Sequence, residues 1–147
     1  MRETFDNSSA VVIGRDGTFL EIYPAVETIP AEGYWRLPIR VLSPALSATS
    51  DIDLARWSGG APSLIKYFDD LAAGWRGWEG AREWSDDEGG VKLSAVHAAV
   101  GDIELAISLQ PSFGMLTAGC WELQIVVPIE PGQLESIARS IRGLFSV

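Results

Sequence analysis

The chain has 147 residues, of which 47% are hydrophobic and 10% aromatic, and 20 acidic against 11 basic residues give a formal net charge of −9. This length suits one domain, residues 1–147, whose core needs no disulfide or metal, and the composition excludes a disordered chain. A single cysteine, Cys120, excludes a disulfide-rich secreted fold, because one thiol cannot form an internal bridge. We expect the polar residues 1–9 to be flexible.

The acidic charge limits the partners that the surface can accept. A net negative surface repels phosphate backbones, which argues against nucleic acid. It favours a basic protein partner, although an acidic surface also serves solubility alone. No apolar run reaches the roughly 18 residues of a membrane span, and the amino terminus has no apolar signal region. The preference for arginine over lysine is typical of a GC-rich bacterial genome. We therefore expect a cytoplasmic bacterial protein without membrane contact, and its oligomeric state stays open.

The first third of the chain predicts strands separated by turns. Residues 10–14 and 18–23 have the pattern of a β-hairpin, and Asp16-Gly17 between them is typical of a type I′ turn. Residues 24–33 are rich in proline and glycine, which predicts a loop.

Apolar residues then recur at every second position from Trp35 to Val41, which predicts a half-buried strand. Pro38 lies inside this strand and cannot donate a ladder hydrogen bond. We therefore expect the strand to lie at a sheet edge or to be bulged. Alternation from Leu46 to Leu54 predicts the next strand.

Two segments have the periodicity of amphipathic helices. The first runs from Pro62 to Gly74, with proline suited to the first turn and glycine to the end, and the spacing places Trp75 in its buried stripe. The second begins at Pro131 and carries an apolar stripe that ends at Phe145.

Between the helices, alternating patterns predict a short strand at 83–86 and longer strands at 91–96, 103–109 and 121–127. Short turns join most of these strands, which favours antiparallel pairing. The order of the elements predicts an α+β fold, in which an antiparallel sheet of about six to eight strands carries two amphipathic helices.

Residues that could support catalysis or bind a metal are few. A structural zinc site needs about four Cys or His ligands, and the chain offers His97 and Cys120. The sequence has no phosphate-binding loop, dinucleotide fingerprint or nucleophile elbow. We therefore expect no cofactor, no metal site and no catalytic set. His97 is the one candidate general base, although a lone histidine at a strand end is more often a packing residue with one hydrogen bond.

The most unusual segment, residues 75–90, concentrates tryptophan, arginine and acid. Tryptophan and arginine are enriched at interface hot spots, and an acidic cluster would speed association with a basic partner. The structural alternatives are indoles that hold the core, Trp78 or Trp84 stacked on arginine, and acids in a solvated turn. The candidate partner-binding residues are Arg76, Trp78, Glu79, Arg82, Trp84, Asp86, Asp87 and Glu88.

Three stretches carry a family resemblance: Phe68 to Trp84 with its Trp-Arg-Gly-Trp-Glu-Gly run, Val91 to Pro111, and Glu130 to Leu134. Over roughly residues 60–147 the chain resembles domain of unknown function 6228, a family seen mostly in actinobacteria. The resemblance implies no established activity. The layout of that family is similar to small immunity proteins, which neutralise toxins of neighbouring bacteria.

One position departs from the family pattern. Many members carry Gly-His where this chain has Gly101-Asp102, and this departure argues against a catalytic histidine at that turn.

Three hypotheses for the function follow. The first is a non-enzymatic protein-binding module, immunity-like in its role. The alternative is a small-molecule binder or enzyme with a site near Trp78, Trp84 and His97, in which His97 or Glu79 carries the proton. The third is a purely structural subunit.

Overall fold

The computed structural model describes residues 10–29, 33–55, 59–86, 90–98, 101–110 and 118–145, so residues 1–9, which we expected to be flexible, lie outside the described residues. Within these ranges the chain forms nine β-strands in two antiparallel sheets and two α-helices. The predicted α+β class, antiparallel pairing and two helices are confirmed. The single sheet of about six to eight strands is corrected to two sheets.

The first sheet contains β1 (Val11–Arg15), β2 (Thr18–Ile22), β3 (Val26–Ile29), β4 (Tyr34–Ser43) and β5 (Leu46–Leu54). The hairpin turn between β1 and β2 is confirmed, because Asp16 and Gly17 both have positive φ, as a type I′ turn requires. The loop predicted at 24–33 instead includes β3, which pairs with the start of β4.

The expectation that Pro38 marks an edge or a bulge is wrong. β4 is the central strand: β2 and β3 pair with successive parts of one side and β5 with the other. Pro38 lies opposite the gap between β2 and β3, where Tyr23 N donates to its carbonyl oxygen over 2.9 Å. The N–H that proline lacks would point into the same gap, so no ladder hydrogen bond is lost.

The second sheet has the order β6 (Ala81–Ser85), β7 (Val91–His97), β8 (Ile103–Leu109), β9 (Leu123–Ile129). Alternating burial along β7 and β8 confirms the period-two pattern that predicted them. The two sheets meet where β9 lies against β1 and β2. Gly14 permits this approach, since a Cβ there would lie 2.7 Å from Val127 Cγ1, and its φ of 123° also favours glycine.

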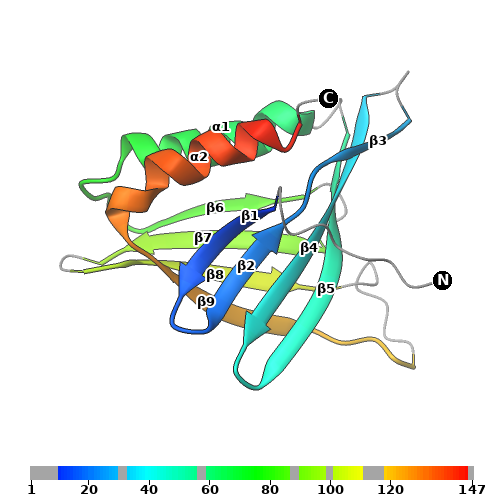
Figure 1. Ribbon diagram of the computed structural model, residues 1–147, viewed down its shortest axis with the longest axis horizontal. Coiled ribbons are helices and arrows are strands. Elements are labelled where there is room, and N and C mark those ends of the chain that lie inside the picture. The colour runs from blue at the N-terminus through cyan, green and yellow to red at the C-terminus, as the bar shows by residue number, and fades with distance from the viewer. Residues whose placement is uncertain are drawn as a thin grey trace.

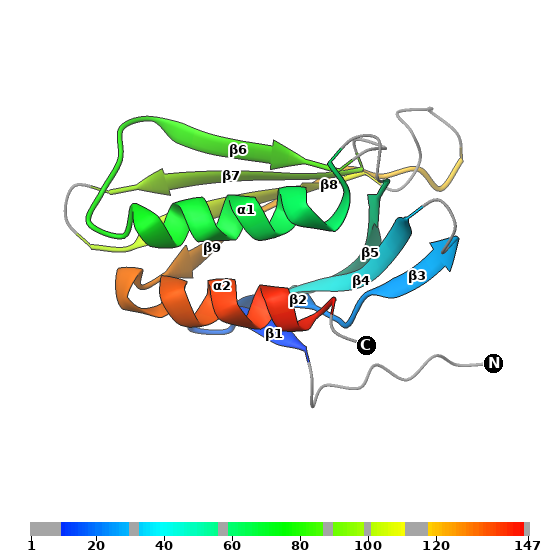
Figure 2. The ribbon, with the colours of Figure 1, turned by 90° about the horizontal axis from the view of Figure 1, so that it is seen from above.

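The helices are α1 (Gly60–Ala73) and α2 (Leu134–Gly143), and a short 3₁₀ turn, Pro131–Gln133, precedes α2. They lie side by side along one margin of the sheets and run in opposite directions (Figures 1 and 2). An ion pair between Asp69 and Arg142 joins them. Neither of these helices is both long and apolar enough to cross a membrane.

The core fills the space between the two sheets and beneath the helices. The side chains of this core come from the apolar faces that the sequence predicted. The alternating face of β4 is fully buried from Leu37 to Val41, and the apolar faces of both helices point inward. Core side chains from four of the elements are Leu37, Ile39, Val41, Leu105, Ile107, Phe68, Leu71, Ile137 and Ile141.

Candidate functional site

The loop that joins α1 to β6, residues 74–80, carries the first tryptophan of the unusual segment. Trp75 is 49% exposed, so the prediction that it belongs to the core stripe of α1 is wrong. Because α1 ends at Ala73 and is capped by Gly74, as predicted, the next residue no longer follows the helical period. Arg76 lies over the indole, with Cζ 5.1 Å from the ring centroid.

Trp78 and Arg82 form a brace between α1, β6 and β7. The guanidinium of Arg82 lies 4.6 Å from the ring centroid of Trp78 and donates to the carbonyl oxygen of Asp70, in the last turn of α1, over 2.8 Å. The indole Nε1 of Trp78 donates to Ala95 O, in β7, over 3.1 Å. The predicted stacking is confirmed for Arg82 on Trp78, while Arg76 stacks on Trp75 instead. These groups hold the loop in place.

His97 completes this brace at the end of β7. Its Nδ1 lies 2.8 Å from Ala98 O and its Nε2 lies 2.8 Å from Trp75 O, and its ring meets the ring of Trp78 edge-on at 5.1 Å. Both ring nitrogens therefore face carbonyl oxygens, where the sequence predicted one hydrogen bond. The imidazole positions the backbone of the exposed Trp75.

Trp84 belongs to the contact between β6 and α1. Its Nε1 donates to Ser63 Oγ over 3.3 Å, and its ring packs against the core. Tyr67 of α1 donates its hydroxyl to the carbonyl oxygen of Arg82 over 2.9 Å, and burial raises the pKa of this phenol. These two hydrogen bonds join β6 to α1.

Asp86 is a buried carboxylate rather than part of an exposed patch. It is 5% exposed, and its two oxygens accept the N–H groups of Val91 and Asp53, each over 3.2 Å. It therefore links β7 of the second sheet to β5 of the first. Burial raises the pKa of Asp86 above its ordinary value. Asp87 and Glu88 lie outside the described residues, so their predicted role stays a prediction.

Solvent reaches Trp75, Arg76 and Glu79, and a groove opens beside Trp75. We call this groove of about 540 Å³ the Trp75 groove; it lies between the end of α1 and the start of α2, and its lining residues are Ala72, Ala73, Trp75, Pro131, Gly132 and Glu135. Sequence reasoning missed its second wall, because residues 131–135 are far from residue 75 in the chain.

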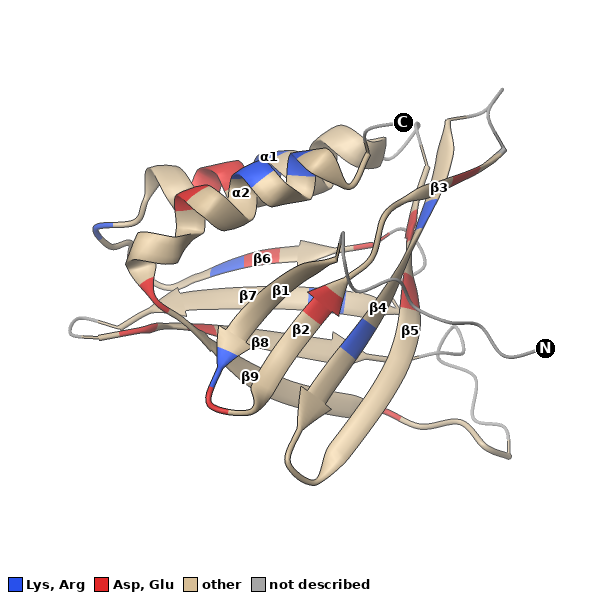
Figure 3. Ribbon diagram, in the orientation of Figure 1, with Lys and Arg blue, Asp and Glu red and all other residues tan. Residues whose placement is uncertain are grey.

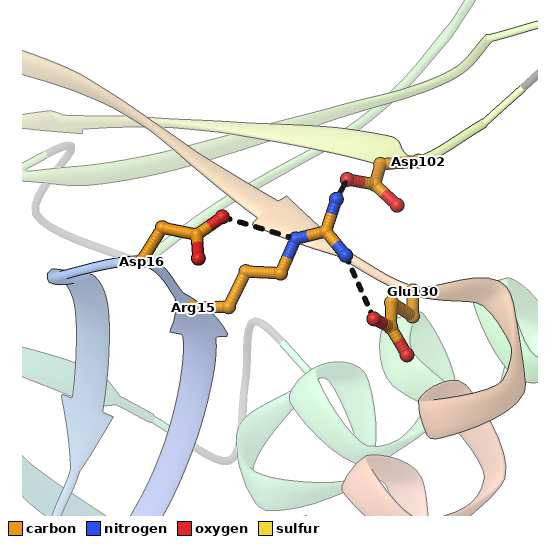
Figure 4. A network of polar contacts seen from close by, with 4 residues as sticks. All are labelled: Arg15, Asp16, Asp102 and Glu130. Carbon is orange, nitrogen blue, oxygen red and sulfur yellow. Dashed lines mark hydrogen bonds and ion pairs between the residues drawn. The ribbon is translucent and has the colours of Figure 1, made fainter.

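A polar cluster around Arg15 joins the two sheets at another place (Figure 4). Nη1 of Arg15 donates to Glu130 Oε1 over 2.7 Å, Nε lies 3.5 Å from Asp16 Oδ2, and Nη2 pairs with Asp102. Asp102, in the turn between β7 and β8, is thus an ion-pair partner of Arg15. In the described part of the chain, no group of three or more His, Cys, Asp or Glu side chains is placed to hold a metal ion.

The charges are spread over the molecule. Figure 3 shows acidic residues on strands of both sheets and on both helices, with basic residues interspersed among them. Several described charges are paired, as in Arg36 with Asp53 and Arg40 with Glu21. The net charge of −9 is therefore a property of the whole surface.

Comparisons with known proteins place the chain in a family. The model of a family of unknown function, DUF6228, matches residues 29–147. Among proteins with curated descriptions, none matches the chain. Solved structures that match include the plant transcriptional regulator PBF-2, with a TM-score of 0.47 and 11% identity over 98% of this chain and 82% of that one, a likeness that carries no inference about function. The chain belongs to the DUF6228 family of unknown function.

Proposed function

We propose that this protein is a non-enzymatic binding module that recognises a basic partner protein at the Trp75 groove. The observation that carries the proposal is the 49% exposure of Trp75, a large indole held at the rim of a groove of about 540 Å³. Tryptophan is among the residues most enriched at binding hot spots. An immunity-like role, in which binding itself neutralises the partner, is part of this proposal.

The groove is held in shape before any partner arrives. Trp75 O is bound by His97, and the loop that follows is fixed by the stacking of Arg82 on Trp78. A preorganised surface loses less conformational entropy on binding, which raises the affinity for a given contact area. The brace residues thus support recognition indirectly, and Trp75, Arg76 and Glu79 make the contacts.

The chemistry of the groove suits a lysine or arginine side chain of the partner. Ala72 and Ala73 offer an apolar wall for the aliphatic stem, and the exposed carboxylate of Glu135 lies at the far wall for the cationic head. Glu135 contacts Arg139 at 3.4 Å, but this pair is exposed and therefore weak enough to be exchanged. The net charge of −9 adds long-range attraction for a basic partner.

The alternative of a catalytic or small-molecule site near Trp78, Trp84 and His97 has less support. Both ring nitrogens of His97 face backbone carbonyl oxygens, and both indole N–H groups donate to protein acceptors. In this arrangement the polar atoms of the three side chains serve the fold.

Affinity capture from a lysate of the source cell tests the proposal. The immobilised protein should retain a basic protein at low salt and release it as salt is raised, because the attraction is electrostatic. Trp75→Ala should weaken the affinity for the captured protein at least tenfold, which corresponds to a loss of about 1.4 kcal/mol of binding free energy. Trp121→Ala is the matched control, since Trp121 is also an exposed tryptophan but does not line the groove. Equal capture by wild type and Trp75→Ala would contradict the proposal.

A further inference from the structure

Lys92 differs from the other basic residues in the described part of the chain. Each of those pairs with a carboxylate, as Arg36 does with Asp53, or lies over an indole ring, as Arg76 does. The side chain of Lys92 is exposed and forms no ion pair or hydrogen bond with any residue that the structure describes. On a chain of net charge −9, this cation is available to a negatively charged ligand.

The cross-strand register places hydroxyl and amide groups beside Lys92. Ser85 of β6 lies opposite Lys92 of β7, and Ser108 of β8 lies on its other side. Gln124 of β9 lies next to Ser108 and extends the row. Directly opposed side chains have Cβ atoms about 4.5–5.5 Å apart, so the ammonium can reach the hydroxyl on either side. Because the residues before and after Lys92 are buried, this polar row lies on the sheet face that points away from the core.

Two surface hollows, of about 510 Å³ and about 410 Å³, meet at Lys92 and Ser108. We call the two hollows together the Lys92 groove; besides the row, its polar lining residues are Glu83 and Ser94 in the first hollow and Gln110 and Glu122 in the second. The groove therefore has a positive charge where the hollows meet and a carboxylate in each of them. None of the residues that line it lines the Trp75 groove.

We propose that the Lys92 groove binds a sugar acid, which is a ligand with one carboxylate and several hydroxyl groups. The ligand carboxylate accepts hydrogen bonds from the ammonium of Lys92 and from the hydroxyls of Ser85 and Ser108. The hydroxyl groups of the ligand donate to Glu83 in the first hollow or to Glu122 in the second. Donors where the hollows meet thus bind the carboxylate, and acceptors further out bind the hydroxyl groups.

The charges of the groove select this ligand class. One ammonium balances one carboxylate, while Glu83 and Glu122 repel a second negative charge on the ligand. A phosphate ester carries a charge of about −1.5 to −2 near neutral pH, and Lys92 is the one basic side chain among the described residues that line the groove. A neutral sugar would leave the ammonium without a charged partner. A hydroxyl-rich monocarboxylate satisfies both the ammonium and the two glutamates.

NMR spectroscopy of the protein titrated with sodium glucuronate tests the site. The chain has two lysines, so the two ε-methylene signals separate Lys92 from Lys66. Glucuronate should shift the Lys92 signal with a millimolar Kd, because the ligand is small and the site is exposed. The Lys66 signal should stay in place, since Lys66 already pairs with Asp70. No saturable shift of Lys92 up to about 50 mM glucuronate, or equal shifts of both lysines, would overturn the proposal.

Three further ligands separate the role of charge from that of the hydroxyl groups. Glucose has the hydroxyl groups without the charge, and acetate has the charge without the hydroxyl groups, so each should bind at least tenfold more weakly than glucuronate. Glucose-6-phosphate should also bind more weakly, because Glu83 and Glu122 repel its second negative charge. Acetate that binds as tightly as glucuronate would contradict the role of the hydroxyl groups. Tighter binding of glucose-6-phosphate would contradict the monocarboxylate assignment.

Variants test whether the cation and its neighbouring hydroxyl carry the binding. Lys92→Gln should weaken glucuronate binding at least tenfold, whereas Lys66→Gln removes the same charge elsewhere and should bind like the wild type. Ser108→Ala should weaken binding about twofold to tenfold, the effect of one hydrogen bond. Backbone amide shifts in β7 and β8 report binding in each variant, and circular dichroism checks that each is folded. Wild-type affinity in a folded Lys92→Gln variant would refute the site.

Discussion

At the scale of single residues, Trp75 and Trp78 show how far neighbouring tryptophans can differ in environment. Trp75 is 49% exposed, whereas Trp78 is half-buried between the guanidinium of Arg82 and the ring of His97. The difference arises because Trp78 finds an acceptor for its N–H in Ala95 and a cation for its face, while Trp75 follows the helix cap. Composition alone could not separate them.

Asp86 gives a stability prediction at the same scale. Asp86→Ala should lower the free energy of unfolding by about 1–3 kcal/mol, because two backbone N–H groups lose a buried acceptor. Urea denaturation of both proteins measures the difference. Glu122→Ala is a suitable control, since Glu122 is an exposed acid just before β9. An effect no larger than that of the control would mean that water replaces the carboxylate at no cost.

Asp86 also predicts a pH dependence. Burial raises its pKa in the folded state above the ordinary 3.8. At pH values between 3.8 and the raised pKa, the Asp86 carboxyl binds more protons in the folded chain than in the unfolded chain. Its contribution to stability is therefore fully present below pH 3.8 and is lost as pH rises through the raised pKa. Denaturation across this window should show a difference between wild type and Asp86→Asn that shrinks as pH rises. A difference independent of pH would contradict the assignment.

At the scale of elements, the end of α1 is stabilised by a side chain from the next strand. Arg82 of β6 brings its positive charge to the carbonyl end of the helix, where the helix dipole favours a cation. Gly74 leaves room for this, because a Cβ there would lie 2.7 Å from Nη1 of Arg82. The glycine thus both ends the helix and admits the arginine.

This arrangement predicts that the effect of Gly74→Ala depends on Arg82. In an Arg82→Ala background, Gly74→Ala should stabilise the fold by about 0.4–1 kcal/mol, because alanine restricts the unfolded chain. In the wild type the new methyl group displaces the guanidinium, so the same change should be neutral or destabilising. Thermal unfolding of the four proteins of this cycle measures the coupling, and additive effects would show that the methyl group does not disturb Arg82.

At the scale of the whole molecule, two polar contacts link the sheets at separate places. Asp86 connects β7 to β5, and Arg15 connects the hairpin of β1 and β2 to the start of β8 and the end of β9 (Figure 4). Arg15 ends β1 and Glu130 directly follows β9, so the Arg15 cluster adjoins the contact of β9 with β1 and β2. Hydrophobic burial supplies the attraction between the sheets, and these polar contacts fix the orientation of one sheet relative to the other.

Arg15→Ala should therefore lower stability modestly and in a salt-dependent way. The Arg15 side chain is 41% exposed, so screening limits the loss to about 1 kcal/mol or less at low salt. Urea denaturation of the wild type and the variant at low and high salt should show the difference narrowing as salt rises. A larger loss that salt does not change would indicate that packing of the Arg15 stem, rather than charge, is responsible.

The sequence by itself determined the local elements, because they depend on short-range periodicity. Alternation predicted the long strands, the helical stripes predicted α1 and α2, Asp16-Gly17 predicted the hairpin turn, and Gly74 predicted the end of α1. The Trp-Arg-Gly-Trp-Glu-Gly run indicated the family, which the match over residues 29–147 confirms.

Tertiary structure alone decided the division into two sheets and the environment of each polar side chain. Pro38 is tolerated in a central strand because a gap lies opposite it, and nothing near Pro38 in the sequence marks that gap. Asp86 begins a run of three acids in the sequence, yet it is buried because N–H groups from two sheets meet at its carboxylate. Trp75 borders a groove only because α2 begins beside the end of α1. Such long-range contacts leave no periodic signal, since they depend on where distant segments meet in space.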